Sequence, residues 1–102
     1  MKHLVIAEPA AHDLEGIVDY IALDNPAAAE GAYRGIITAA YKLPQFPSLG
    51  RPERHPETRE LSVSGLPYLI VYEVSAEAVT ILAVFRTARE LIQAIRERAK
   101  AN

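Results

Sequence analysis

The chain has no cysteine and no tryptophan among its 102 residues. Without cysteine it forms no disulfide bond and has no thiolate nucleophile, which fits an intracellular protein. Its apolar runs are all shorter than the ~20 residues of a membrane span, and the run that follows Lys2 is too short for a signal peptide. We therefore expect a soluble cytoplasmic protein that does not act at a membrane.

A strong charge of either sign is also missing. The formal net charge is −2, and 24% of the residues are charged. Residues 1–50 carry three Lys/Arg and six Asp/Glu, whereas residues 51–102 carry eight and seven. Because nucleic-acid-binding domains are clearly basic, we expect no direct sequence-specific binding to nucleic acid. The length and the ordinary composition predict one globular domain over residues 1–102.

The first half of the chain predicts a strand and two antiparallel helices. The strand is expected at His3–Ile6, and apolar residues at i, i+3, i+4 and i+7 predict a helix over residues 9–23, with Asp13 among its surface residues. Asn25 is a good N-cap for a second helix, and the short connection makes the two helices a hairpin. The helical tyrosines are expected to pack against the core; they are Tyr20, Tyr33 and Tyr41.

The second half predicts a three-stranded antiparallel meander and a last helix that begins near Arg89. The strand-like runs are residues 59–63, 68–74 and 79–85, with short connections between them. The last two runs have apolar residues of both parities, so each face of this sheet needs cover. One face can pack on the helices. The other is covered by the C-terminal helix or by another polypeptide, and the pattern leaves both open.

Phe46–Pro52 connects these halves. Two prolines and a glycine stop the preceding helix and predict a rigid, exposed connection, because a flexible linker would be built from Gly and Ser. We expect Phe46 and Leu49 to hold this loop against the core. Arg51 is a candidate for contact with a partner.

The sequence offers few groups for catalysis, and we name no confident catalytic residue. It has no Gly-rich phosphate loop and no nucleophile elbow, and His55 is better interpreted as an exposed loop residue than as a general acid or base. RNA cleavage would need a proton-transfer pair and cations. The cations available for it are Arg59, Arg86 and Arg89, but no proton-transfer pair accompanies them. We expect no cofactor and no metal site.

Six stretches, taken together and in order, resemble the RelE/ParE toxin superfamily of bacterial type II toxin–antitoxin systems, on the ParE side. The stretches are Ala10–Ile21, Asp24–Ala29, Phe46–Pro52, Arg59–Leu61, Tyr68–Tyr72 and Ala88–Leu91. The resemblance implies a small α+β fold, β-α-α-β-β-β with a C-terminal helix, in which a helical hairpin packs on an antiparallel sheet. It also implies a hetero-oligomer with a ParD-like antitoxin encoded in the same operon.

The two branches of this superfamily imply different targets. ParE-like members poison DNA gyrase, whereas RelE-like members cut mRNA on the ribosome with a catalytic arginine in the strand that here spans Tyr68–Tyr72, which has no cation. Arg89 matches an arginine found in both branches. Arg86 stands where ParE-like members often have a histidine, a departure that favours a cationic site.

We therefore expect a gyrase inhibitor that acts by protein–protein contact rather than an enzyme. The alternatives are a ribosome-dependent endoribonuclease and an inactive member that only binds its antitoxin. The arginines are expected to meet an acidic antitoxin tail. The candidate partner-binding residues are Arg51, Arg59, Arg86, Arg89, Tyr68 and Tyr72.

Overall fold

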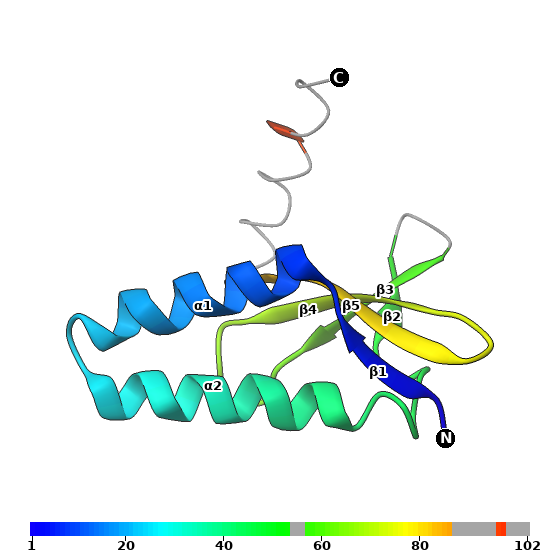
Figure 1. The fold of residues 1–102 in the computed structure, drawn as a ribbon, viewed down its shortest axis with the longest axis horizontal. Helices are drawn as coiled ribbons and strands as arrows, with labels where there is room; N and C mark the ends of the chain where they lie inside the picture. Colours follow the sequence, from blue (N-terminus) through cyan, green and yellow to red (C-terminus); the bar gives the residue numbers. More distant parts are fainter. Residues whose placement is uncertain (54–56, 87–95, 98–102) are drawn as a thin grey trace.

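A helical hairpin and a five-stranded sheet make up the fold of this computed structural model, which describes residues 1–53, 57–86 and 96–97. The sheet has the order β1-β5-β4-β3-β2, and both helices lie across one of its faces (Figure 1). The expected α+β fold is confirmed. The elements are β1 (His3–Ile6), α1 (Glu8–Ala22), α2 (Pro26–Tyr41), β2 (Arg51–Pro52), β3 (Thr58–Ser62), β4 (Leu69–Val74) and β5 (Ala78–Phe85).

The sheet is mixed, whereas a purely antiparallel sheet was expected. β1 pairs parallel with β5, and the other neighbouring strands are antiparallel. A parallel pair needs a long crossover, and here the helical hairpin and strands β2 to β4 all lie in the connection between β1 and β5. The pattern did not predict β2, a two-residue strand at the opposite edge. Pro52 is tolerated there because an edge strand leaves one side of its backbone unpaired.

The C-terminal part of the chain falls mostly outside the described ranges. Of the expected last helix, only Arg96 and Glu97 are described, and both are helical. This helix was also one of the two expected covers for the outer face of the sheet, so that expectation lies outside the described residues. No helix within the described ranges is long and apolar enough to cross a bilayer.

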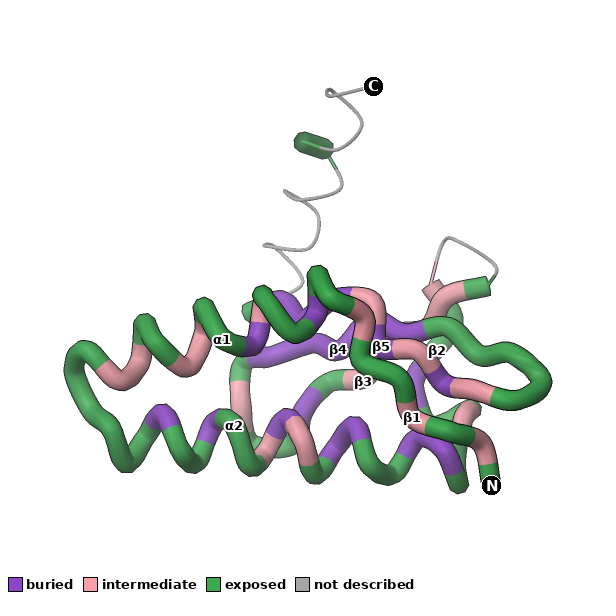
Figure 2. Tube along the Cα trace, in the orientation of Figure 1, coloured by how far each residue is buried: buried purple, intermediate pink, exposed green. Residues whose placement is uncertain are grey.

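The core lies between the helices and the sheet, and a bulge in β5 shapes it. Tyr72 pairs with Ile81 while Val71 pairs with Ala83, so Leu82 is an extra residue on β5. The bulge shifts the side-chain alternation, and Ile81 therefore joins the hairpin-facing core together with Val84, three residues further on. Figure 2 shows this burial as a nearly continuous stretch along β4 and as a recurring stripe along α2.

A smaller apolar cluster lies on the opposite face of β4 and β5. The register pairs Leu69 with Phe85 and Val71 with Ala83, and these side chains expose at most 9% of their surface. The apolar residues of both parities in β4 and β5 therefore form two separate clusters, one on each face of the sheet. The bulge adds to that pattern because it changes which parity faces the hairpin.

The helical tyrosines are exposed, so the expectation that they pack in the core is wrong. Tyr20, Tyr33 and Tyr41 expose 69%, 46% and 68% of their surface. Small residues take the core-facing positions of α2 instead, chiefly alanines around Ile36. These short side chains let α2 pack closely against α1, and the bulky rings remain at the surface.

Asp13 ties α1 to the sheet, although its place in the helical pattern predicted a surface residue. The backbone N–H of Val84 donates to Asp13 Oδ2 at 3.0 Å. β1 ends at Ile6, which is level with Ile81, so Val84 lies beyond the end of its neighbouring strand. The carboxylate therefore accepts the hydrogen bond that a longer β1 would have taken.

We expect Asp13→Ala to destabilise the fold by about 1–3 kcal/mol, because the Val84 N–H loses its acceptor. Glu15→Ala is the matched control, since Glu15 is an exposed carboxylate on the same helix. Its effect should stay within about 0.5 kcal/mol. Urea unfolding of both variants measures the difference, and equal losses would show that the hydrogen bond contributes nothing.

Candidate functional site

The central loop Phe46–Pro52 is held from beneath by the hydroxyl of Tyr72. This hydroxyl donates to the carbonyl of Pro47 at 2.8 Å and accepts the N–H of Gly50 at 2.8 Å. Arg59 Nη1 donates to the carbonyl of Gly50 at 2.7 Å. Tyr72 on β4 and Arg59 on β3 are directly paired in the sheet, so the sheet register places both groups under the loop.

Polar groups hold this loop, and the apolar side chains that were expected to do so are at the surface. Phe46 and Leu49 expose 55% and 49% of their surface, so that expectation is wrong. The Leu49 N–H donates to the Phe46 carbonyl at 3.1 Å, which closes a β-turn with Pro47 at its favoured second position. Gly50 is buried instead, because its N–H and carbonyl bond Tyr72 and Arg59.

Gly50 has no room for a side chain. A Cβ built on it would lie 2.6 Å from the Tyr72 hydroxyl oxygen and 2.7 Å from the backbone carbonyl oxygen of Glu60. The Glu60 carbonyl belongs to β3 and cannot move without disturbing the sheet. Close approach of two backbones is therefore the reason for glycine at this position.

Arg51 forms an ion pair with a buried carboxylate. Its Nε donates to Glu60 Oε1 at 2.6 Å, and its Nη2 contacts the same oxygen. The two residues are paired across β2 and β3. Glu60 exposes only 7% of its surface, whereas the Arg51 side chain is 76% exposed. Arg51 is thus accessible to a partner, as a predicted contact residue should be, but Glu60 already holds it.

The structure does not bring Arg59 and Arg86 into one cationic cluster. Arg59 is level with Tyr72 on β4, whereas Arg86 follows Phe85, which is level with Leu69. From strand spacings, the register separates the two arginines by roughly 15 Å, with β4 between their strands. Arg89 lies outside the described residues. The roles of these arginines in RNA cleavage or partner binding stay predictions.

Tyr68 and Tyr72 are core residues in this structure. Tyr68 exposes 7% of its surface and Tyr72 exposes none. Neither side chain presents a surface to a partner, so the predicted partner contact gains no support from their position. Tyr72 instead holds the central loop through its hydroxyl. The β-branched and aromatic pattern of its strand did not indicate this role.

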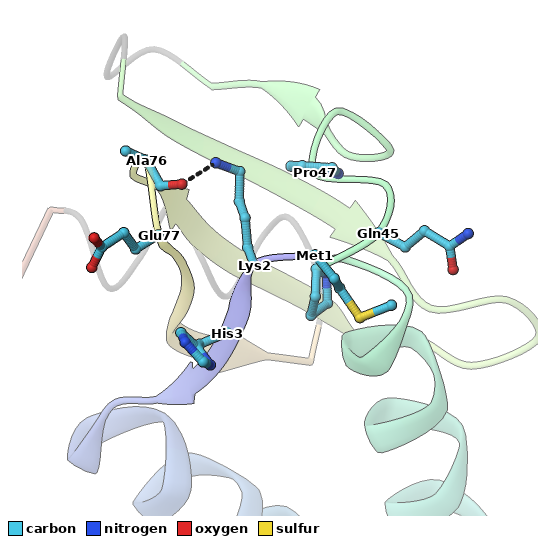
Figure 3. Close-up of a pocket in the computed structure, with 8 residues that line it drawn as sticks. Met1, Lys2, His3, Gln45, Pro47, Ala76 and Glu77 are labelled. Carbon is cyan, nitrogen blue, oxygen red and sulfur yellow. Dashed lines mark hydrogen bonds between the residues drawn. The ribbon is translucent and has the colours of Figure 1, made fainter.

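An open hollow of about 840 Å³ lies beside the N-terminus, between residues 44–47 and the β4–β5 turn (Figure 3). Lys2 Nζ donates to the carbonyls of Ser75 and Ala76 at 2.6 and 2.9 Å. This lysine therefore ties the chain start to the turn, and its ammonium is already engaged.

A second hollow, of about 680 Å³, is lined by charged and hydroxyl side chains, among them Arg59, Glu73 and Thr80. Among the described residues, no cluster of His, Asp and Glu is suited to a metal ion. His55, the best general acid or base by residue type, lies outside those ranges. The lining of this second hollow thus offers hydrogen-bonding and ion-pairing groups.

Gly50→Ala should lower the free energy of unfolding by about 1–3 kcal/mol, because the new methyl group forces the Tyr72 hydroxyl away from the loop. Gly31→Ala is the control: its Cβ meets nothing within 4 Å, and the helix interior should gain about 0.5–1 kcal/mol. Thermal or urea unfolding gives both values. Two variants that shift stability in the same direction would contradict the proposed crowding at Gly50.

Burial raises the pKa of Tyr72 above its ordinary value of 10.0, although the Gly50 N–H and the charge of Arg59 act in the opposite direction. The folded state therefore prefers the neutral phenol, whose stabilisation is complete below pH 10 and is lost as the pH rises towards the folded pKa. A phenolate also cannot donate to the Pro47 carbonyl.

Tyr72→Phe should cost about 1–3 kcal/mol at neutral pH, because the loop loses both hydrogen bonds to the hydroxyl. The difference in unfolding free energy between the native protein and this variant should then shrink above pH 10. Urea unfolding across an alkaline pH series measures it. A difference that stays constant with pH would exclude this role for the hydroxyl proton.

Comparisons with known proteins place the chain in a family. The model of the family described as "ParE toxin of type II toxin-antitoxin system, parDE" matches residues 4–91. "Putative toxin Y4kP" of Sinorhizobium fredii (strain NBRC 101917 / NGR234) is 37% identical over 86 residues, which cover 84% of this chain and 88% of that protein.

The fold points to the same family. A solved structure described as "Chromosomal ParDE TA system from P. aeruginosa" superposes with a TM-score of 0.79 and 28% sequence identity. The similarity covers 85% of this chain and 97% of that one. Sequence and fold therefore agree across most of the chain, which belongs to the ParE toxin family of type II toxin–antitoxin systems.

Proposed function

We propose that this ParE-family toxin arrests growth by inhibiting DNA gyrase through protein–protein contact, and that a ParD-like antitoxin encoded in the same operon neutralises it. The observation that carries the proposal is the match to the ParE toxin family over residues 4–91. A ParDE system is also the solved structure that this fold resembles. Because gyrase acts on the chromosome, the proposed target implies a cytoplasmic protein. The proposed antitoxin implies that the toxin is part of a hetero-oligomer when the antitoxin is present.

The positions of the arginines support contact rather than chemistry. Arg59 donates to the Gly50 carbonyl, so its guanidinium already serves the loop. Arg86 lies on the far side of β4 from Arg59, so the register does not bring the two together. An RNA-cleaving site would need such cations to converge on a single phosphorane.

Arg51 supports the antitoxin part of the proposal. Its guanidinium lies at the surface, and Glu60 fixes its orientation from the buried side. A carboxylate of an acidic antitoxin segment would add a second ion pair to a guanidinium that is already positioned. The side chain therefore needs little reorganisation to accept this contact.

The test adds the purified protein to gyrase, relaxed plasmid and ATP. We expect supercoiling to be inhibited, and addition of the purified antitoxin to restore it. Growth arrest should follow induction of the toxin alone and should be relieved by co-expression of the antitoxin. Normal supercoiling at saturating toxin would count against gyrase as the target.

The same cultures test the nuclease alternative. Transcripts mapped by primer extension after induction should be intact, and Arg86→Ala should not abolish the arrest. Codon-positioned cuts that disappear in Arg86→Ala would instead identify a ribosome-dependent endoribonuclease. Undisturbed growth under strong expression would identify an inactive member that binds only its antitoxin.

A further inference from the structure

The turn at the tip of the central loop presents a pair of apolar side chains. Because Leu49 donates its N–H to the Phe46 carbonyl at 3.1 Å, the Cα atoms of the two residues lie within about 7 Å of each other. Their side chains, 55% and 49% exposed, leave the backbone at the two ends of one turn. They are two exposed apolar residues at the ends of one turn, which we call the Phe46–Leu49 pair.

The backbone that carries this pair is fixed without help from the pair itself. The Phe46 N–H donates to the Lys42 carbonyl at 2.9 Å, and the Tyr72 hydroxyl and Arg59 fix Pro47 and Gly50. A partner that binds the pair therefore pays little entropy to order the loop. The fold gains only part of the burial energy of the Phe46 ring and the Leu49 methyl groups, since about half of each residue's surface stays exposed.

We propose that the Phe46–Leu49 pair is the part of the toxin that contacts its protein target, by inserting into an apolar pocket with an acidic rim. The inference rests on the proposed action through protein contact and adds the place of that contact. Tyr72 and Arg59 are then positioning residues, because they hold the turn and do not themselves touch the target.

The charges around the pair favour an acidic rim. The segment from Lys42 to Arg51 contains these two cations and no acidic residue. Lys42 is exposed, and the Arg51 side chain is 76% exposed. Glu60, the partner of Arg51, is buried and presents almost no surface to a partner. The exposed Glu77 lies across the hollow beside Pro47, on the side of the β4–β5 turn.

The exposed position of the pair on a turn favours a folded target over the other occupants. An extended antitoxin segment binds grooves and sheet edges, which can enclose its side chains. A second copy of this chain would need an apolar pocket, but the two hollows within the described ranges carry charged residues, Lys2 and Glu77 in one and Arg59 and Glu73 in the other. Contact between copies through such unlike surfaces would also be head-to-tail rather than closed.

The test is a double variant, Phe46→Ala with Leu49→Ala, and a matched control, Tyr20→Ala with Leu23→Ala. The control also removes one aromatic ring and one leucine, which expose 69% and 86% of their surface on the helical hairpin. We expect the loop variant to lose about thirtyfold or more in inhibition of gyrase supercoiling and to lose growth arrest. The control should retain both.

Two further measurements keep the result interpretable. Thermal unfolding should be unchanged in both variants, and antitoxin affinity should stay within about threefold, a change of less than one kcal/mol. A loop variant that inhibits as well as the native toxin, or a control that loses as much, would overturn the inference. A parallel loss of antitoxin affinity would make the antitoxin the occupant, and loss of a native dimer in sedimentation would make it a second copy.

Failure of this inference is separable from failure of the proposed target. If the native toxin arrests growth without inhibiting gyrase, the gyrase proposal fails. Growth arrest by the loop variant still decides the inference in that case, because this readout does not depend on which protein is the target. Arrest that persists in the loop variant overturns the role of the pair, whatever the target.

Discussion

The central loop, which connects the helical half of this protein to the strands that follow, depends on the hydrogen bonds of the Tyr72 hydroxyl. This hydroxyl comes from the centre of the sheet, emerges under the central loop and bonds that loop at Pro47 and at Gly50. Its surroundings explain several other choices in the chain. Gly50 must lack a side chain to reach the hydroxyl, and Arg59 must face the same way to satisfy the Gly50 carbonyl.

Because hydrogen bonds from Tyr72 and Arg59 hold the central loop, its apolar residues are not needed to anchor it. A loop held by Phe46 and Leu49 would have buried them, and its outer surface would have been polar. Here the buried groups are a glycine and a phenol, and the apolar side chains point away from the core. The arginines divide in a similar way: Arg59 serves the loop from within, whereas Arg51 is at the surface and is held by a buried carboxylate.

The sheet shows why the burial of residues in this chain does not follow directly from the hydrophobic pattern of the sequence. An extra residue at Leu82 shifts the alternation within β5, so Ile81 before it and Val84 after it, residues of opposite parity, both face the hairpin. The helices show the converse: the tyrosines fall at regular spacing, yet alanines occupy the core-facing positions of α2. Close packing of α2 against α1 favours the small side chains, and the tyrosine rings remain at the surface.

The sequence by itself determined the first strand, the helical hairpin, the strands of the meander and the family resemblance, because periodicity, caps and proline positions are local signals. Only the tertiary structure decided the parallel pairing of β1, the bond from Asp13 to Val84 and the position of Tyr72 under Gly50. These contacts join residues 71 and 22 positions apart in two of those cases, and no local pattern encodes them. The exposure of Phe46 and Leu49 follows from the same contacts, since the groups that hold the loop come from strands far along the chain.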